Sequence, residues 1–387
     1  MKEIKISETY TNNKEVNAVS KVIKSGWLTS GQITNYFENK VSKYLNSKNV
    51  IAVNSCTNGI FATLKALNLK KGDEVITSPY TFISTINTLY QLDLKIIFAD
   101  ISMDDYNINF DQIKKKITKK TKCILITHFG GNPFDITKLS KIKNKKIKIV
   151  EDAATALGAQ IYNKKIGSYS NSVSIFSLYA NKIITTGEGG LISTADKKLA
   201  KRIRNLVNIG ISKTPWIRSK NKVPYLYDLI EPGYKFNFTD LQASMGIEQL
   251  KKLDQIITYR KKIRSFYDKE LNNLVKQEFI KILKINKNFK GSEYIYTILI
   301  NKNKNKKLRD NLIKFLKRNK INTTVHYIPL FELRFYKNKF NKKNFPNTNY
   351  VYKNIISLPF HNNLKLKDVK YITKIINIFF KYENQKK

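Results

Sequence analysis

Residues 177–190 read SLYANKIITTGEGG, with Lys182 set between a short apolar run and a glycine-rich turn. The residues just before it, VSIFSL at 173–178, predict a buried strand, so Lys182 follows a strand end. Ligands of open α/β sheets bind beyond the carboxyl ends of the strands. A lysine in that place can form a Schiff base if its pKa is lowered, although most lysines are simply solvated. Lys182 therefore becomes a candidate only if neighbouring strand ends carry groups that act with it.

Apolar runs of strand length recur on both sides of this stretch, and helical or turn segments separate most of them. They occupy residues 49–54, 95–101, 122–128, 146–152 and 189–194. Nearly continuous apolar strands between helices indicate a mostly parallel sheet that is buried on both faces. The predicted fold class is therefore α/β, with a three-layer α/β/α arrangement.

The pattern changes near the middle of the chain. Residues 249–271 predict one long amphipathic helix, and alternating apolar runs follow at 293–300 and 321–330. This change indicates a second, smaller α+β domain. The sequence thus divides into a large domain at residues 12–248 and a small C-terminal domain at residues 249–387.

Composition limits the class of protein. The chain has 387 residues, of which 42% are hydrophobic, enough to bury a large core. It lacks an apolar run of the roughly 18 residues that a membrane span needs, and its N-terminus lacks the apolar core of a signal peptide. We therefore expect a cytoplasmic protein without a membrane partner. Cys56 and Cys123 fit neither a metal-ligand spacing nor a disulfide framework, so no metal site is expected.

The charge is strongly positive, with 71 Lys and Arg against 29 Asp and Glu and a net charge of +42. Taken alone, this balance indicates a nucleic-acid or anionic-membrane partner. The lysines are spread over the whole chain, however, and a nucleic-acid footprint must cluster. We therefore expect no nucleic-acid partner, but a diffuse positive field that attracts small anionic molecules.

Two further strand ends carry groups that complete a set with Lys182. Ser55, Cys56 and Thr57 open a predicted helix, where free amides form either an anion site or an ordinary cap. Asp152 ends the run at 146–152 and is either a helix cap or a carboxylate that faces a ligand. Each feature alone is weak. Together they match pyridoxal 5'-phosphate (PLP), because helix amides hold the phosphate, an aspartate pairs with the pyridine nitrogen and a lysine holds the aldehyde.

The chain resembles the DegT/DnrJ/EryC/StrS-type nucleotide-sugar aminotransferases, which are PLP enzymes of the aspartate-aminotransferase fold (fold type I). The resemblance covers nearly the whole length. Its motifs, in chain order, are NSCTNGI, GDEVITSPYTFISTIN, VEDAATALGA, FSLYANKIITTGEGG, PGYKFNFTDLQASMGIEQL, VHYIPL and SLPFH. The resemblance implies a large PLP-binding domain at 12–248.

The resemblance assigns roles to individual residues. Lys182 corresponds to the lysine that bonds to the cofactor, and Asp152 to the partner of the pyridine nitrogen. Further cofactor contacts are implied for Cys56 and Thr57 near the phosphate, Ser177 at the phosphate, Phe82 stacked on the ring, and Thr155 where Gln or His usually contacts the ring oxygen. Cys56 departs from the usual glycine and brings a side chain to a crowded backbone site.

Other implied roles concern the partner chain and the substrate. In PGYKFN, either Lys235 or Asn237 corresponds to the group that reaches the phosphate from the partner subunit, because the family is typically a homodimer with shared active sites. Trp27, Thr29 and His326 are candidate substrate residues, and the resemblance implies that the N-terminal residues 1–30 contribute to the substrate site. For His326 packing is an equal alternative, and for Trp27 a place in the core is at least as well supported.

The resemblance also implies a reaction. An amino acid, glutamate by expectation, gives its amino group to a keto sugar linked to a nucleotide diphosphate, at C4 of a UDP-sugar, for amino-sugar and polysaccharide biosynthesis. The alternatives are a dTDP-, GDP- or CMP-type keto sugar, amination at C3, or a PLP-binding regulator without turnover.

Overall fold

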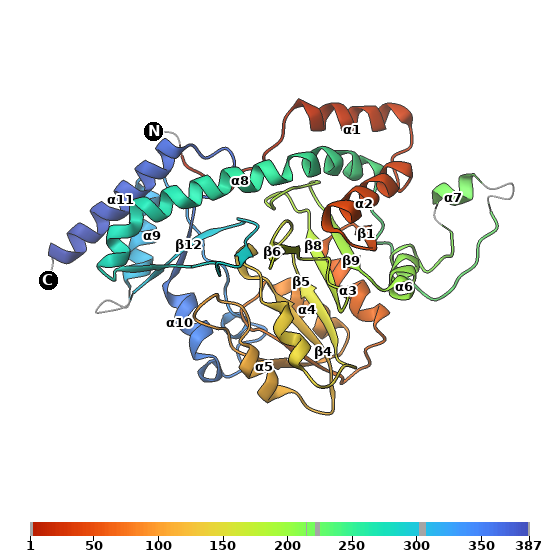
Figure 1. Cartoon of the computed structure of the whole chain (residues 1–387), viewed down its shortest axis with the longest axis horizontal. Helices are drawn as coiled ribbons and strands as arrows, with labels where there is room; N and C mark the ends of the chain where they lie inside the picture. The colour runs from red at the N-terminus through yellow and green to blue at the C-terminus, as the bar shows by residue number, and fades with distance from the viewer. Residues whose placement is uncertain (1–2, 214, 221–224, 302–306, 386–387) are drawn as a thin grey trace.

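A computed structural model describes residues 3–213, 215–220, 225–301 and 307–385 (Figure 1). Its main sheet has seven strands within these ranges: β1 (Asn49–Val53), β2 (Glu74–Thr77), β3 (Lys95–Phe98), β4 (Thr121–Thr127), β5 (Lys148–Asp152), β8 (Ser172–Ser177) and β9 (Gly190–Thr194). Their order in space is β1-β9-β8-β5-β4-β2-β3. β9 is antiparallel to both of its neighbours, and the other pairs are parallel.

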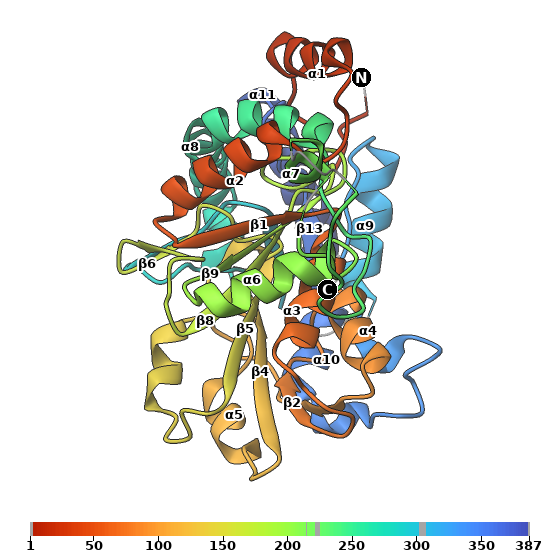
Figure 2. The same ribbon diagram turned by 90° about the vertical axis from the view of Figure 1, so that its right-hand side faces the viewer.

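Helices cover both faces of this sheet, which confirms the α/β class. One face packs against α3 (Cys56–Ala66), α4 (Ile83–Gln91) and α6 (Lys197–Val207), which lie together in Figure 2. The other face packs against α2 (Gln32–Leu45) and the first half of α8 (Asp240–Lys276). Every residue of β8 and β9 is buried, as expected for strands between two helical layers.

The C-terminal region forms a second, smaller layer. An antiparallel sheet of β10 (Ile280–Ile282), β12 (Tyr296–Ile300) and β13 (Ile355–Leu358) packs on α9 (Leu308–Arg318), α11 (Leu366–Gln385) and the second half of α8. The run 321–330 forms only isolated bridges, at Ile321 and Thr324, before η3 (Leu330–Glu332). None of the helices in the described ranges is long and apolar enough to cross a membrane.

The described ranges contain further helices and a minor sheet. They are α1 (Asn13–Ser25), α5 (Phe110–Lys116), α7 (Pro215–Ser219), α10 (Pro346–Asn354), η1 (Phe129–Gly131), η2 (Ile136–Lys141), η4 (Lys342–Asn344) and a minor sheet of β6 (Gln160–Ile161), β7 (Lys164–Lys165) and β11 (Phe289–Lys290).

Helix α8 has 37 residues and runs along both parts of the chain (Figure 1). It begins nine residues before the expected start at 249, because Thr239 and Gln242 form a capping box. The carboxylate of Asp240 accepts hydrogen bonds from the N–H groups of Gly31 and Thr34, which ties the N-terminal segment to this helix. The expected domain boundary at residue 248 lies inside α8, and the division into 12–248 and 249–387 stays a prediction.

Candidate active site

A cavity of ≈ 620 Å³ opens at the carboxyl ends of β1, β5 and β8. Its lining includes eight residues singled out from the sequence: Cys56, Thr57, Phe82, Asp152, Thr155, Ser177, Lys182 and His326. The parallel strands end at the same edge of the sheet, and the fold therefore gathers groups that are far apart in the chain.

Asp152 is the last residue of β5 and is almost fully buried. Its carboxylate accepts a hydrogen bond of 2.5 Å from the Thr85 hydroxyl and one of 3.1 Å from the N–H of Ala154. These donors fix the orientation of the carboxylate, which lines the cavity without a cationic partner among the described ion pairs. Asp152 therefore presents an oriented carboxylate to the cavity.

Lys182 lies in the turn between β8 and β9. Its Nζ is 3.4 Å from the Tyr294 hydroxyl and 4.7 Å from the centre of that ring. The glycines that follow allow the turn to approach helix α3, because a Cβ on Gly190 would lie 2.7 Å from the backbone N of Cys56. The glycine-rich turn thus brings the lysine loop and the helix start to one side of the cavity.

Helix α3 begins at this edge. Ser55 caps it, accepting a hydrogen bond of 3.1 Å from the N–H of Asn58. The first amides of a helix have no intrahelical partner, and they carry the positive end of the helix dipole. The start of α3 at Cys56 and Thr57 therefore offers donors that suit an anion. Burial, and then the charge of Asp152, raise the pKa of the Cys56 thiol, which keeps this side chain neutral.

Comparison with known proteins identifies the family to which this chain belongs. The DegT/DnrJ/EryC1/StrS aminotransferase family matches residues 9–377. The chain belongs to this family. It is 34% identical to the spore coat polysaccharide biosynthesis protein SpsC of Bacillus subtilis, over 94% of this chain and 93% of the relative. It is 32% identical to the UDP-4-amino-4,6-dideoxy-N-acetyl-beta-L-altrosamine transaminase of Campylobacter jejuni, over 95% of each chain.

A solved structure agrees with this assignment. A Streptococcus pneumoniae protein assigned as a sugar aminotransferase, in its PLP-form, has a TM-score of 0.89 and 27% identity, over 98% of this chain and 99% of that chain. The same protein was also solved in its PMP-form. Enzymes of the DegT/DnrJ/EryC1/StrS family depend on PLP. The chain is therefore a PLP-dependent aminotransferase, of a family that includes sugar aminotransferases.

The residues of the cavity fit this cofactor. The α3 amides and Ser177 supply donors for a phosphate, Asp152 supplies a carboxylate for a ring nitrogen, and Lys182 supplies the amine. Phe82 lies at the cavity with its side chain 58% exposed, and can cover one face of a flat ring. The Cys56 side chain lines the cavity, and its Sγ lies 3.9 Å from the carbonyl of Ile175. The individual contacts stay predictions.

Four candidates lie outside this cavity. Trp27 packs edge to face on Trp216, with ring centres 5.0 Å apart. The carbonyl of Thr29 accepts a hydrogen bond from the N–H of Asp240. Asn237 donates to the Ser30 hydroxyl at 3.2 Å, and Lys235 is exposed. Within one chain, none of these four residues lines the cavity. Of the expected N-terminal segment, residues 1–2 lie outside the described residues.

Tyr294 and Thr85 reach the site although the sequence analysis did not single them out. Tyr294 comes from the segment before β12 and contacts Lys182, while Arg260 of α8 donates to its carbonyl at 3.3 Å. Its place in the fold depends on this long-range contact, and no local pattern marks it. Thr85 lies in the motif GDEVITSPYTFISTIN, so the resemblance could have identified it.

The two histidines near the site have different surroundings. His326 lines the cavity, and burial, with the nearby Lys182 charge, lowers the pKa of His326 to about 4. Its Nδ1 lies 2.8 Å from the Ser357 hydroxyl. His128 is fully buried and lies 2.9 Å from the Glu151 carboxylate, and it does not line the cavity. The structure thus places His128 in packing and His326 where a neutral imidazole can meet a ligand.

Proposed function

We propose that this enzyme transfers an amino group from L-glutamate to C4 of a UDP-linked keto sugar, in the cytoplasm, for amino-sugar and polysaccharide biosynthesis, including lipopolysaccharide. The observation that carries the proposal is the meeting of Lys182, Asp152 and the start of α3 in one cavity. The Campylobacter relative, a transaminase named for a UDP-4-amino sugar, supports the choice of nucleotide and position.

Each residue would then have a defined task. When bound, PLP supplies an electron sink that stabilises negative charge at the substrate carbon. The amine of Lys182 accepts the proton from Cα of the amino-acid donor, as a general base held beside the reacting carbon. The Asp152 carboxylate stabilises a proton on the ring nitrogen, and the α3 amides bind the phosphate.

The charge of the chain favours a nucleotide sugar. A net charge of +42 gives a positive field, and a diphosphate linkage is strongly anionic. The cavity also extends beyond the cofactor residues to Tyr179, Glu188 and His326, which leaves polar groups for a second ligand. Since His326 is neutral above its lowered pKa, it can donate to or accept from a sugar hydroxyl without adding charge.

The substrate is tested with a panel of nucleotide keto sugars. Purified holoenzyme is incubated with glutamate and UDP-, dTDP-, GDP- or CMP-linked 3-keto or 4-keto sugars, and the products are analysed by mass spectrometry. We expect amination of a UDP-linked 4-keto sugar and matching release of 2-oxoglutarate. Turnover of another nucleotide or of the 3-keto sugars alone would replace the proposed substrate. Cofactor binding without turnover of any member would favour a PLP-binding regulator.

We further propose a homodimer in which each active site takes Lys235 or Asn237 from the partner chain. The support is a projecting segment around α7 (Figure 1), which exposes apolar side chains that a monomer would leave in water. Tyr225 is 80% exposed, and Leu226 and Leu229 are exposed by 60% and 58%. Such a patch indicates an interface. Lys235 supplies a cation and Asn237 an amide, and both groups are suited to bind a phosphate.

Subunit mixing tests the shared site. Lys182→Ala chains and chains with both Lys235→Ala and Asn237→Ala are each expected to be inactive. In a hybrid dimer, one site combines both defects and the other has none. Mixing equal amounts with subunit exchange should therefore restore about a quarter of the wild-type activity per chain.

Two controls are needed to interpret the recovery of activity on mixing. Mass spectrometry of differently labelled chains measures the exchange, and mixing each variant with itself gives the baseline. No recovery despite proven exchange between two inactive parents, or a fully active monomer, would remove the shared site from the proposal.

A further inference from the structure

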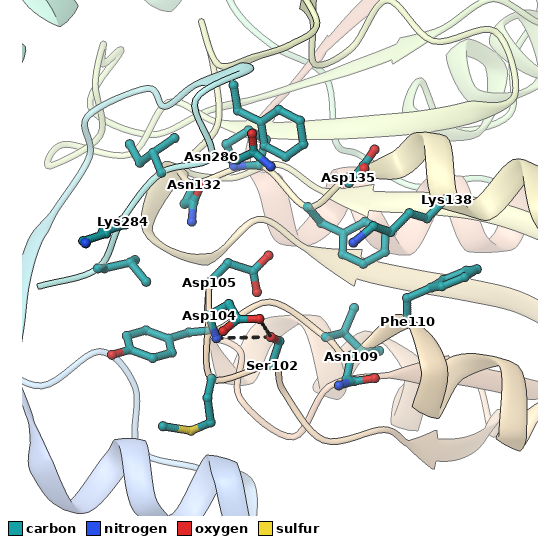
Figure 3. A pocket seen from close by; sticks show the side chains of 18 of the residues that line it. Ser102, Asp104, Asp105, Asn109, Phe110, Asn132, Asp135, Lys138, Lys284 and Asn286 are labelled. Atoms are coloured by element: carbon teal, nitrogen blue, oxygen red, sulfur yellow. Dashed lines mark hydrogen bonds between the residues drawn. The ribbon is translucent and has the colours of Figure 1, made fainter. Parts of the chain in front are cut away.

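A second hollow, of ≈ 970 Å³, is larger than the aminotransferase cavity. It lies between the loops that follow β3 and β4 and the segment 281–289 of the C-terminal region (Figure 3). The two hollows share no lining residue. This second cavity also lies beyond strand ends, where open α/β sheets bind ligands.

One polar group in this cavity lacks a partner. Asn132 is only 4% exposed, and its Nδ2 has no hydrogen bond among the described residues. Figure 3 shows the amide of Asn132 pointing into the cavity, on the side where Asp105 lies. A buried donor without an acceptor costs about 1–3 kcal/mol, so such a group is expected to meet a ligand or water.

Asp105 provides an acceptor in the same cavity. The N–H and the Nδ2 of Asn107 donate to its carboxylate at 3.0 and 3.1 Å, and Asn107 Nδ2 also donates to the carbonyl of Asn132 at 3.3 Å. Asn107 therefore fixes both residues in one rigid unit. Burial raises the pKa of Asp105, as expected for a carboxyl group that is largely removed from water.

The other residues that line this second cavity favour a neutral ligand with an apolar face. Phe110 and Phe289 line the cavity as half-buried rings. Four Asp and five Lys side chains also line it, and Lys114 pairs with Asp111 at 2.8 Å, so no single charge sign dominates. A sugar ring matches this set, because its hydroxyls both donate and accept while its C–H face covers apolar and aromatic surfaces.

We propose that this cavity binds a neutral sugar ring, with Asn132 Nδ2 donating to one hydroxyl and Asp105 accepting from a neighbouring hydroxyl. The site is separate from the aminotransferase cavity and does not depend on the identity of the keto sugar. A sugar held here would lie between the loops of the main sheet and the C-terminal region. It would therefore be a second carbohydrate site on the enzyme.

Methionine NMR offers a direct test, because the chain has 3 Met and Met103 lines the cavity. Holoenzyme with 13C-methyl methionine is reduced with borohydride to fix the cofactor, and Met103→Leu assigns the Met103 signal. D-Glucose, D-galactose, N-acetyl-D-glucosamine and uridine are then titrated. We expect at least one sugar to shift the Met103 signal saturably, while the signal of Met245, on α8, stays in place.

Two variants connect the shift to the proposed contacts. Asn132→Leu keeps a similar shape without the donor, and Asp105→Asn removes the charge of the acceptor; each should weaken binding about tenfold. Asp105→Asn provides the test if Asn132→Leu fails to fold. Lys122→Ala, at an exposed position of β4 outside the cavity lining, is the control and should bind normally. The proposal is overturned if no sugar shifts the Met103 signal, if uridine alone does, or if both variants bind like the wild type.

Discussion

Lys182→Ala is expected to abolish covalent attachment of PLP and to lower the rate of amino transfer by about 10⁴-fold or more, because one amine both holds the cofactor and moves the proton. Lys182 is the one lysine that lines the cavity among the residues the structure describes. The measurement is borohydride reduction of the holoenzyme, followed by digestion and mass spectrometry of the labelled peptide. The wild type should carry the cofactor on Lys182, and the variant on no residue.

A matched control is available in the same chain. Lys164 also lies over a tyrosine ring, with its Nζ 4.5 Å from the centre of Tyr169, but it is exposed and outside the cavity. Lys164→Ala should therefore keep both the label and the activity. Wild-type label on any lysine other than Lys182 would show that the assignment is wrong.

Asp152→Asn should still bind PLP but lose activity by about 10²-fold or more, because a neutral amide no longer stabilises a proton on the ring nitrogen. Cofactor titration by absorbance separates binding from turnover, which is measured under saturating substrates. Near-normal turnover would contradict the role of this carboxylate.

Two other variants refine this test. Thr85→Val removes the hydroxyl that donates to Asp152 at 2.5 Å, and should lower the rate less than Asp152→Asn because the charge remains. Asp254→Asn changes a carboxylate that accepts from the Tyr44 hydroxyl on the surface. It should leave the rate unchanged. A drop for Asp254→Asn as large as that for Asp152→Asn would indicate a general effect on stability.

The strand-end groups could be predicted because each belongs to a local pattern. The run 146–152 predicts β5 and places Asp152 at its end, and 173–178 predicts β8 ahead of Lys182. Parallel strands end at the same edge of a sheet, so the meeting of these groups can be predicted without knowing how the side chains pack. The helix that follows β1 was predicted from its hydroxyl-rich opening residues and its apolar face, and α3 begins at Cys56.

Groups supplied by distant elements could not be predicted in this way. Tyr294 reaches Lys182 only because the C-terminal region folds back along α8, where Arg260 holds the carbonyl of Tyr294. The alternation at 321–330 predicted a strand-like run, yet pairing there is limited to isolated bridges because sheet partners are set by tertiary contacts. Lys235 and Asn237 do not line the cavity of their own chain, and only the resemblance assigns them a role at a phosphate.

The contacts of helix α8 also bear on the order in which the chain can fold. Asp240 accepts from the N–H of Gly31, 209 residues away, and Gln249 donates to the carbonyl of Tyr10, 239 residues away. During synthesis, α1 and α2 leave the ribosome long before α8 exists, so the residues that α8 covers stay open to water or to a chaperone. Closure over such long loops slows folding. The segment that is made first is therefore among the last to reach its final place.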